Sequence, residues 1–591
     1  MSAEPVYAAP RPPAVSGEAA VELRPEALAA AQERAAPPSN LALAARRFGS
    51  RYPQARRDWP RRLAGVLLMA AMLAYLPWMF THLSAAHPWL AWPFAAASVL
   101  SAICLTVSVI NGWTSRVTPP RPLRGDDVPA VAVIVPTCGE PVEMVLRTVL
   151  SVRGQDYPAD RLVVVVSDDA HNPELRRAVD GLGVIYHEPP PLHAPGRDGA
   201  PKSGNLNSAM ALIRERFPDV AFVETRDADD EVGVDDFLRQ TVGQLVADGR
   251  LAFVQTVKEA QVSAGDPFCN LDGQFYQGQM LTRNAANATF PCGSGLVWRR
   301  AALDDIGDFP TWNLVEDLQS GVEALRRGWR GCYLPIVGAV GQHSPEDVAN
   351  IVKQRGTWAI DTVRLMLWGR KRGLSLRQRL QFSETALFYA HSFTVLVYVP
   401  CTALACVSLL PLDASPVQCL VFLMPYALIG ELRLLLLNEP FADRRRRQRH
   451  PLRALWRLKV IWIGLAPVYM LACAKALAGG PRRKPVYRVT RKTTHVRWYW
   501  RETLVQAALA ACVPAGFAVG VAADALPSPL VLISAGYWGV MNSAALGGFV
   551  TRGWFGLSLA PLVLRALGRP PRPEPDPALA LLGAARPRTS G

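Results

Sequence analysis

The chain has 591 residues, of which half are hydrophobic and 19% are charged, and its net charge is +15. This apolar content is high for a soluble protein, and it gathers in blocks on either side of a middle section of ordinary soluble composition. Positive charge lies next to these blocks, which indicates a membrane protein and argues against a nucleic-acid-binding surface. The ten cysteines have no paired spacing, which argues against a disulfide or zinc framework.

The N-terminal region combines a polar tail with a predicted transmembrane pair. Residues 1–45 are rich in Ala, Pro and Glu, which predicts a mostly disordered tail. Two transmembrane helices are expected in residues 63–110, where the runs Leu63–Leu83 and Trp89–Ile110 are each long enough to cross about 30 Å of hydrocarbon. The first run starts too late and is too long for a cleavable signal peptide. Basic residues on both outer flanks predict a cytoplasmic N-terminus and a cytoplasmic section after the pair.

Residues 125–345 have the pattern of a soluble α/β domain. Three apolar runs, Val131–Val135, Leu162–Val166 and Ala221–Thr225, are typical of strands buried on both faces. They alternate with helical segments, which predicts a doubly wound, mostly parallel sheet. Each run ends in a polar turn, and ligands bind at the carboxyl ends of the strands in such sheets. The sequence therefore predicts a ligand site at this edge, with solvated acidic loops as the alternative.

The C-terminal part alternates apolar and basic segments. Residues 346–379 are amphipathic and predict helices on the membrane surface. Two spans are expected in residues 384–437, and two more in residues 504–549. Residues 456–500 hold an apolar run with internal charges and then basic residues, which favours an interfacial or re-entrant segment over a seventh span. The prediction is six spans with both termini cytoplasmic, and a disordered tail over residues 566–591.

Short polar motifs recur in order along the chain. They are Pro136-Thr137…Glu140-Pro141, Asp168-Asp169, Lys202-Ser203-Gly204-Asn205-Leu206-Asn207, Asp227-Ala228-Asp229, Phe290-Pro291-Cys292-Gly293-Ser294, Val315-Glu316-Asp317, Gln354-Arg355-Gly356-Thr357-Trp358 and Tyr487-Arg488-Val489-Thr490-Arg491-Lys492. This set resembles glycosyltransferase family 2, in its processive, cellulose-synthase-like membrane branch, from about residue 130 to residue 495. The resemblance implies a GT-A-like α/β domain inserted between α-helical transmembrane segments.

The resemblance assigns donor roles to the first four motifs. Asp229, with Asp227, is implied to hold Mg²⁺ or Mn²⁺ against the diphosphate of a nucleotide-sugar, and carboxylate oxygens suit these hard cations. Lys202 is implied to reach a phosphate or a base carbonyl, and a solvated loop lysine is the alternative. The remaining implied donor contacts are Thr137, Glu140 and Asp169.

The resemblance assigns acceptor binding and catalysis to residues of the later motifs. Asp317, preceded by Glu316, is implied to be the general base that takes the proton of the acceptor hydroxyl, a role usually worth about 10²–10⁴-fold in rate. The alternative is that both acids favour a helix N-terminus, and the two roles are compatible. Trp358 is implied to stack on the terminal acceptor sugar. The acceptor-side turn consists of Cys292, Gly293 and Ser294.

The motif around Trp358 departs from the family pattern. Thr357 stands where the family has an arginine that meets the diphosphate. On a helix, Lys353 lies one turn before Thr357 on the same face and could supply the missing charge, as could Arg355. Gln354 keeps the polar contact of the motif, so Gln354 and Arg355 are assigned to donor binding.

The last motif resembles the gating loop of cellulose synthases, with Tyr487 in place of a phenylalanine. Its Thr490 and Lys492 are implied to contact the donor phosphates, which requires a cytoplasmic segment; a short basic loop at the membrane is the alternative. About 40 residues follow the final predicted span. That is too few for the cyclic di-GMP-binding domain that bacterial cellulose synthases usually carry there.

The resemblance implies an inverting, metal-dependent processive glycosyltransferase. It would polymerise a β-linked polysaccharide, a glucan by default, from a nucleotide-sugar and translocate the product across the membrane. One alternative is a non-processive membrane glycosyltransferase that adds a single sugar to a lipid acceptor. Another alternative is a non-enzymatic secretion or scaffold subunit with a decayed site, which is suggested by Thr357 in place of the family's arginine.

The same resemblance sets the expected partners and location. The donor is UDP-glucose by default, and the acceptor is the growing polysaccharide. The lipid bilayer and accessory secretion subunits are further expected partners, and no nucleic acid is expected. The location implied is the inner (plasma) membrane, with several spans and a cytoplasmic catalytic domain.

Overall fold

The protein's structure is a computed structural model, and it describes residues 23–35, 58–191, 194–195, 197, 201–261, 275–343, 347–437, 451–482 and 499–555. The chain separates into two compact units. The first consists of Met1–Tyr52, Val117–Gln261 and Thr289–Gln342. The second consists of Pro53–Arg116, Val262–Ala288 and His343–Gly591.

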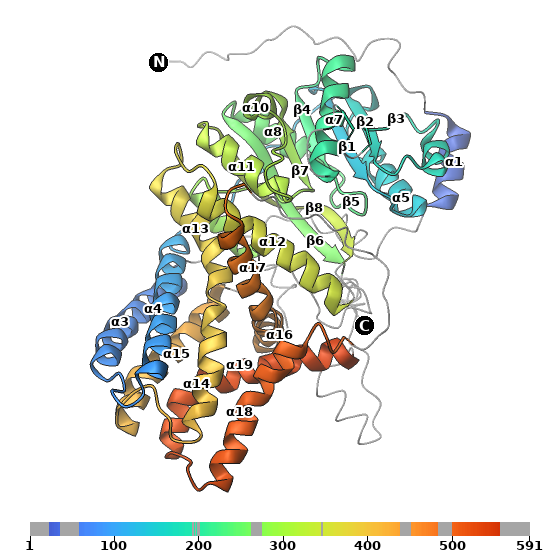
Figure 1. The fold of residues 1–591 in the computed structure, drawn as a ribbon. Coiled ribbons are helices and arrows are strands. Elements are labelled where there is room, and N and C mark those ends of the chain that lie inside the picture. The colour runs from blue at the N-terminus through green and yellow to red at the C-terminus, as the bar shows by residue number, and fades with distance from the viewer. Residues whose placement is uncertain are drawn as a thin grey trace, which may run out of the picture. The chain divides into compact units, whose positions relative to one another are not determined.

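The first unit contains an eight-stranded sheet with the order β3-β2-β1-β4-β7-β6-β8-β5 (Figure 1). Its strands are β1 (Val131–Thr137), β2 (Leu162–Asp168), β3 (Val184–His187), β4 (Phe222–Thr225), β5 (Glu231–Val232), β6 (Leu251–Gln261), β7 (Leu296–Arg299) and β8 (Arg330–His343). Strands β3, β2, β1 and β4 run parallel. Strand β7 is antiparallel to both β4 and β6, and β5 is antiparallel to β8.

The predicted α/β sheet is therefore present, but it is mixed, and its parallel part ends at β4. The apolar runs identify buried strands, because a strand covered on both faces needs apolar side chains in both directions. They do not report direction, which depends on how the chain returns to the sheet. The three strands predicted from apolar runs, now β1, β2 and β4, all lie in the parallel half.

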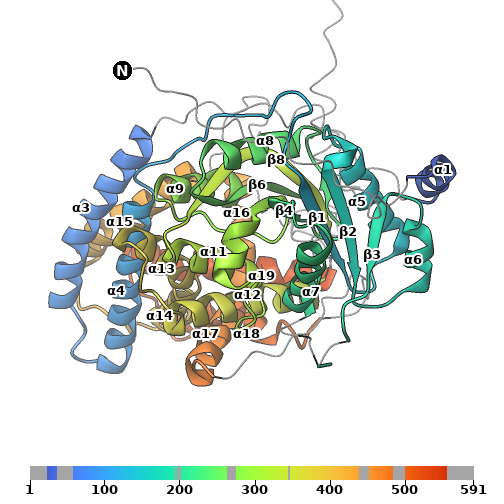
Figure 2. The same ribbon diagram turned by 90° about the horizontal axis from the view of Figure 1, so that it is seen from above.

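Two helical layers cover the two faces of this sheet. Successive side chains of a strand point to opposite faces, and in β1 Val133 and Val135 pack into one core cluster while Ala132 and Ile134 pack into the other. The first cluster includes residues of α5 (Val142–Arg153), α6 (Pro173–Val179) and α8 (Phe237–Ala247). The second includes residues of α7 (Pro201–Arg216), α10 (Arg300–Ile306) and α11 (Glu316–Arg326) (Figure 2). A 3₁₀ turn, η2 (Ala159–Arg161), precedes β2.

The N-terminal segment corrects one expectation. A disordered tail was expected over residues 1–45, yet Pro25–Arg34 form helix α1. Ala31 is buried, and Arg34 pairs with Glu143 and Glu174 on α5 and α6. Its alanines and Pro25 at the first position favour a helix. Its docking could not be predicted, because α1 buries only a small apolar face and is held by ion pairs to residues distant in sequence.

The described part of the second unit is mainly helical. Its elements are α3 (Trp59–Thr81), α4 (Pro88–Asn111), the π-helical turn η3 (Phe275–Gln279), α9 (Met280–Ala285), α12 (Val348–Trp368), α13 (Leu376–Ala390), α14 (Phe393–Ala405), α15 (Pro416–Leu437), α16 (Pro451–Gly464), α17 (Ala466–Gly479), α18 (Leu504–Ala522) and α19 (Pro529–Phe555). One core cluster joins α3, α4, α14 and α15, and a second joins α12, α16, α17 and α19.

Among the described residues, five helical stretches are long and apolar enough to cross a membrane. They are Trp59–Thr81, Pro88–Asn111, Leu376–Ala405, Pro416–Leu437 and Leu504–Ala522. The pair Leu455–Gly464 and Ala466–Gly479 bends by 47° at its break, which is the geometry of a broken span or of a re-entrant loop. The last span expected within residues 504–549 falls on α19, which is not among these five stretches. The predicted tail over 566–591 lies outside the described residues.

Candidate functional site

The turn of residues 227–230, called the acidic turn, is anchored by a buried ion pair formed by two residues that precede it. Arg226 and Glu224 are both fully buried, with Arg226 Nε 2.5 Å from Glu224 Oε1. The Arg226 guanidinium also donates to the carbonyls of Glu231 (3.0 Å) and Gly338 (3.1 Å). These bonds join the end of β4 to β5 and β8. The backbone of the acidic turn is therefore held in place before any ligand binds.

Asp227 lies between two lysines. Lys202 Nζ is 2.6 Å from Asp227 Oδ1, and Lys258 Nζ is 2.6 Å from Asp227 Oδ2. Burial alone would raise the pKa of Asp227, but the two ammonium groups outweigh it and hold this pKa below its usual value. Burial likewise opposes the charged form of Lys202, yet Asp227 and Glu316 raise the pKa of Lys202 well above its usual value. Both partners are therefore charged at neutral pH.

Lys258, on β6, is a site residue that no motif pointed to. Its side chain is 5% exposed, and its Nζ also lies 2.9 Å from Asp230 Oδ2. The sequence carried one usable signal, because a lysine in an otherwise largely apolar buried strand needs a partner for its charge. Asp230, whose pKa is raised chiefly by its burial, is one of those partners.

Lys202 links the acidic turn to the start of α11. Its Nζ lies 3.5 Å from Glu316 Oε1. Gly293, with φ +82°, lies at the same place, since a Cβ atom there would be 3.1 Å from Lys202 Nζ and 3.4 Å from Asp317 Oδ2. The structure thus brings together Lys202, Asp227, Gly293 and both acids of the Glu316-Asp317 pair, as the motifs predicted from distant parts of the chain.

Asp317 has the electrostatics of a general base. Burial is the main cause that raises its pKa, and the neighbouring Glu316 carboxylate adds to it, so that the pKa is about 7. The backbone N–H of Leu318 donates to Asp317 Oδ1 at 2.6 Å, which orients the carboxyl at the first turn of α11. A carboxyl with this pKa is substantially ionised at neutral pH and still accepts a proton readily.

The turn around Gly293 also supports the acidic turn. Ser294 Oγ accepts a hydrogen bond from the backbone N–H of Asp227 at 3.1 Å. The backbone N–H of Cys292 donates to Gln255 Oε1 at 2.7 Å. The carbonyl of Gly293 accepts from Thr225 Oγ1 at 3.3 Å. All three predicted acceptor-side residues therefore take part in hydrogen bonds that hold this turn against β6 and the end of β4.

The predicted nucleoside residues gather at the ends of β1 and β2. Thr137 Oγ1 donates to Asp168 Oδ1 at 3.2 Å, and Asp168 also accepts from the Tyr186 hydroxyl at 2.8 Å. Asp169 accepts two hydrogen bonds from Arg197, at 2.6 and 2.8 Å. Glu140 Oε2 accepts from the backbone N–H of Cys138 at 2.6 Å.

Two residues of this group, Asp168 and Arg197, have roles that the sequence motifs did not predict. Asp168 is fully buried and serves as an anchor for the turn after β2, where it also accepts from the N–H groups of Ala170 and Asn172. Arg197 was not singled out, because it lies in a Pro- and Gly-rich stretch with no motif of its own. Its bidentate bond to Asp169 neutralises that carboxylate, so the two side chains act as one planar polar unit.

The helix α12, in the second unit, carries the motif around Trp358. The Arg355 guanidinium lies 4.7 Å from the centre of the Trp358 ring. Thr357 Oγ1 donates to the carbonyl of Lys353 at 2.9 Å, so its hydroxyl is used within the helix. Of the two candidates for the missing arginine charge, Arg355 is the one in contact with Trp358. Gln354 lies in the same helix. Thr490 and Lys492 lie outside the described residues.

The donor set of the acidic turn fits a divalent cation that is shared with a substrate. Among the described residues, no group of three His, Cys, Asp or Glu side chains is arranged to hold a metal by itself. Mg²⁺ is usually held by one or two carboxylates together with substrate phosphates. Three carboxylates of the turn, Asp227, Asp229 and Asp230, interact with Lys258, so the turn supplies carboxylate oxygens of the kind that such a cation binds.

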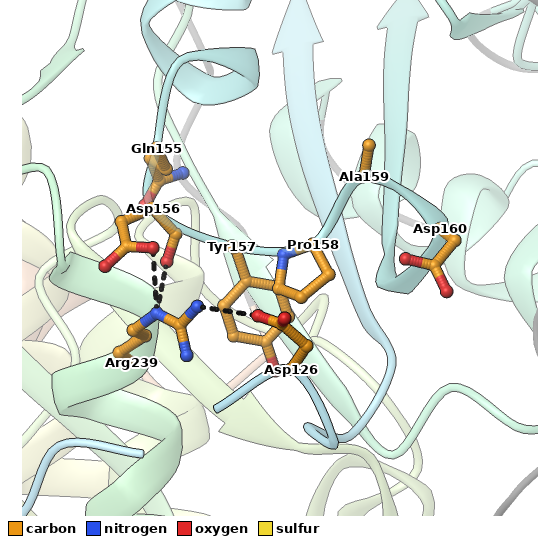
Figure 3. A pocket seen from close by; sticks show the side chains of 8 residues that line it. All are labelled: Asp126, Gln155, Asp156, Tyr157, Pro158, Ala159, Asp160 and Arg239. Atoms are coloured by element: carbon orange, nitrogen blue, oxygen red, sulfur yellow. Dashed lines mark hydrogen bonds and ion pairs between the residues drawn. The ribbon is translucent and has the colours of Figure 1, made fainter. Parts of the chain in front are cut away.

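A shallow hollow of about 470 Å³ lies elsewhere in the first unit (Figure 3). It is lined by Asp126, Gln155, Asp156, Tyr157, Pro158, Ala159, Asp160 and Arg239. Arg239 Nε lies 3.0 Å from Asp156 Oδ1, and its Nη2 lies 3.6 Å from Asp126 Oδ1. The guanidinium is thus neutralised, and the hollow shares no residue with the site around Asp227.

Comparisons with known proteins show what the chain is similar to. Residues 129–360 match the family described as "Glycosyltransferase like family 2". The chain is 28% identical over 347 residues to the UDP-forming cellulose synthase catalytic subunit of Komagataeibacter sucrofermentans, covering 55% of this chain and 44% of that protein. It is 31% identical over 319 residues to putative cellulose synthase 2 of Komagataeibacter xylinus, covering 51% of this chain and 20% of that protein. The chain thus spans half or less of the length of these curated relatives.

A solved structure is also similar. The mannosyltransferase from Pyrobaculum calidifontis in complex with GDP-Man and Mn²⁺ is 20% identical, with a TM-score of 0.45, over 65% of this chain and 99% of that one. The family match, with the mixed sheet, confirms the predicted GT-A-like fold class. The apolar helices and the cellulose synthase homologues identify a membrane protein. Residues 129–360 are therefore a glycosyltransferase family 2 domain, in a chain homologous to bacterial cellulose synthase catalytic subunits.

Proposed function

We propose that this protein is a membrane-embedded processive glycosyltransferase that builds a β-linked polysaccharide from a nucleotide-sugar. The observation that carries the proposal is the proximity of a lysine assigned to the donor side, Lys202, to the base assigned to the acceptor side, Asp317. Lys202 pairs with Asp227 and approaches Glu316, and a Cβ atom on Gly293 would contact both Lys202 and Asp317. Transfer needs such an arrangement, because the leaving group must be stabilised while the attacking hydroxyl loses its proton.

On the donor side, the charged groups act on the leaving diphosphate. Asp229 and Asp227 would hold Mg²⁺ or Mn²⁺, which neutralises charge that develops on the diphosphate as the glycosidic bond breaks. Lys202 adds a fixed ammonium at the same place. Thr137, Glu140 and the Asp169–Arg197 pair lie at the ends of β1 and β2 and would bind the nucleoside.

On the acceptor side, Asp317 would take the proton of the attacking hydroxyl. Its pKa of about 7 suits a base that works near neutral pH. In a single displacement the hydroxyl attacks the anomeric carbon from the face opposite the leaving group, so the linkage is inverted, and an α-linked donor gives a β-linked product. The turn of Cys292, Gly293 and Ser294 would border the acceptor, and Trp358 would stack on its terminal sugar.

The homologues named as UDP-forming cellulose synthases support UDP-glucose as the donor and a glucan as the product. We further propose that the apolar helices pass the growing polymer across the inner membrane, with the catalytic domain and both termini cytoplasmic. The gating segment with Thr490 and Lys492 would close over the bound donor. Accessory secretion subunits would receive the polymer.

A product assay tests this function. The full chain, purified into lipid nanodiscs, is supplied with labelled UDP-glucose and Mn²⁺ or Mg²⁺, and the products are separated by size. Long polymer that a β-glucan-specific hydrolase degrades is the expected result. A single labelled sugar on an extracted lipid would instead establish the lipid-acceptor alternative, and no turnover with a panel of UDP- and GDP-sugars would favour a non-enzymatic subunit.

A further inference from the structure

Lys258 is a charged group of the site that the proposed transfer does not use. Its ammonium bridges two carboxylates of the acidic turn, at 2.6 Å from Asp227 and 2.9 Å from Asp230. Its side chain is 5% exposed and that of Asp230 is fully buried, so this arm of the bridge is shielded from solvent, whereas Asp227 is 23% exposed. Ion pairs with little access to water are much stronger than exposed ones.

Each carboxylate oxygen of Asp227 already has an ammonium partner. Lys202 takes Oδ1 and Lys258 takes Oδ2, each at 2.6 Å. A divalent cation that binds Asp227 would lie within a few ångströms of both ammonium groups, or of one of them if it displaced the other. Like charges a few ångströms apart in a partly buried site repel strongly. Metal binding to the empty site is therefore opposed.

A nucleoside diphosphate changes this balance. Its negative charge gives the ammonium groups of Lys202 and Lys258 a second acceptor, and it brings phosphate oxygens that complete the coordination of a divalent cation. Asp227 would then be free to hold the metal. Binding of the metal and binding of the diphosphate each become easier when the other is present, and such coupling is reciprocal.

We propose that Lys258 is the resident cation of the acidic turn: it keeps divalent metal off Asp227 until a nucleoside diphosphate arrives. Lys258 is thus a positioning residue that makes metal and nucleotide bind together. The proposal rests on the proposed function, because it takes the ligand of this turn to be a nucleoside diphosphate. Its distinctive consequence concerns the metal alone: removing the Lys258 charge should strengthen metal binding to the empty protein.

Electron paramagnetic resonance of free Mn²⁺ measures this directly. The full chain is titrated with Mn²⁺, alone and with saturating UDP. For the unmodified protein we expect weak binding of Mn²⁺ alone and a gain of at least about tenfold with UDP. For Lys258→Met we expect Mn²⁺ alone to bind about tenfold more tightly, since the opposing charge is gone, and the gain from UDP to shrink. Lys258→Arg keeps the charge and should behave as the unmodified protein.

Two controls separate this effect from a general disturbance. Asp229→Asn in the Lys258→Met background should remove the gained Mn²⁺ site. Arg299→Met removes another partly buried cation, on β7, whose acceptors are the backbone carbonyls of Leu251, Leu245 and Asp248, and it should leave Mn²⁺ affinity unchanged. Lys258→Gln, which keeps a hydrogen-bond donor without the charge, is the second test variant if Lys258→Met unfolds.

The outcomes are distinct. If neither Lys258→Met nor Lys258→Gln binds Mn²⁺ alone more tightly than the unmodified protein, the proposal for Lys258 is overturned. If the unmodified protein binds no UDP even with Mn²⁺, the UDP-dependent function fails, while the role of Lys258 is still decided by the titration with Mn²⁺ alone.

Discussion

At the scale of single residues, the proposed chemistry depends on the carboxylate of Asp317. Asp317→Asn keeps the size of the side chain and removes the base. We expect transfer to fall by about 10²–10⁴-fold while UDP affinity stays within about twofold, because the base acts on the acceptor and not on the donor. Initial rates and calorimetric titration with UDP measure the two quantities. Glu323→Gln, on the same helix with an ion pair to Arg326, is the matched control and should keep its activity.

An equal loss of UDP affinity in Asp317→Asn would contradict this assignment. It would place Asp317 on the donor side, next to Lys202, and assign the base to another group.

The pH dependence of the rate tests the same residue without removing it. The pKa of Asp317 is about 7, so below that pH the carboxyl is protonated and cannot accept a proton. We expect kcat/KM to fall about tenfold for each pH unit below 7. In Glu316→Gln the like charge that helps to raise this pKa is gone, and the fall should begin at lower pH. A fall that does not move in Glu316→Gln would assign the titration to another group.

At the scale of an element, the turn of Gly293 positions the two sides of the site. Gly293→Ala would place a methyl group 3.1 Å from Lys202 Nζ in a backbone conformation, φ +82°, that disfavours side chains. We expect a loss of about 1–2 kcal/mol in the free energy of unfolding from backbone strain, together with a clear fall in kcat.

Gly307→Ala is the matched control for this turn. Gly307 has a similar φ of +77°, and nothing lies within 4 Å of its added Cβ. It should lose similar stability while kcat stays unchanged. Equal losses of kcat in both variants would show that strain alone, and not contact with Lys202, explains the effect of Gly293→Ala. Thermal unfolding and steady-state rates supply the comparison.

The buried ion pair of Arg226 and Glu224 stabilises the segment from β4 to β5. Arg226→Met leaves Glu224 as an unpaired buried acid, which should cost about 3–5 kcal/mol of stability. Adding Glu224→Gln should recover part of this loss, because the stranded charge is removed. Arg214→Met, which breaks a partly exposed pair with Asp304 and Asp308, should cost no more than about 1 kcal/mol. Chemical denaturation of the full chain in detergent checks the order, and a larger loss in Arg214→Met would contradict it.

At the scale of the whole molecule, the membrane topology can be tested directly. Residues 482–497 carry seven basic residues, which favours the cytoplasm for this segment. We expect reporters fused after residue 112 and after residue 482 to lie on the same, cytoplasmic side, with the bent pair α16–α17 re-entering without crossing. A reporter after residue 482 that is active only outside the cell would make α16–α17 a true span.

The local motifs of the site could be predicted because each follows from chemistry that is local in sequence. An apolar run must end where polar residues begin, so the turns after β1, β2 and β4 were identified with their acids. The order of the motifs then predicted that Lys202, Asp227 and Asp317 share one site, and the geometry agrees. Lys258 and Arg197 were not predicted as site residues. Their ion-pair partners, Asp227 and Asp169, lie 31 and 28 residues away in the sequence.

The sequence by itself therefore determined the α/β class, the apolar helices and the carboxylates and lysine of the site. Tertiary structure alone decided three other points: that the sheet turns antiparallel after β4, that α1 packs on α5 instead of remaining disordered, and that Asp227 is held by two lysines at once. The physical reason is the same in each case. Strand direction, helix docking and ion-pair partners depend on contacts between distant segments, whose energies are not encoded in any short window of the chain.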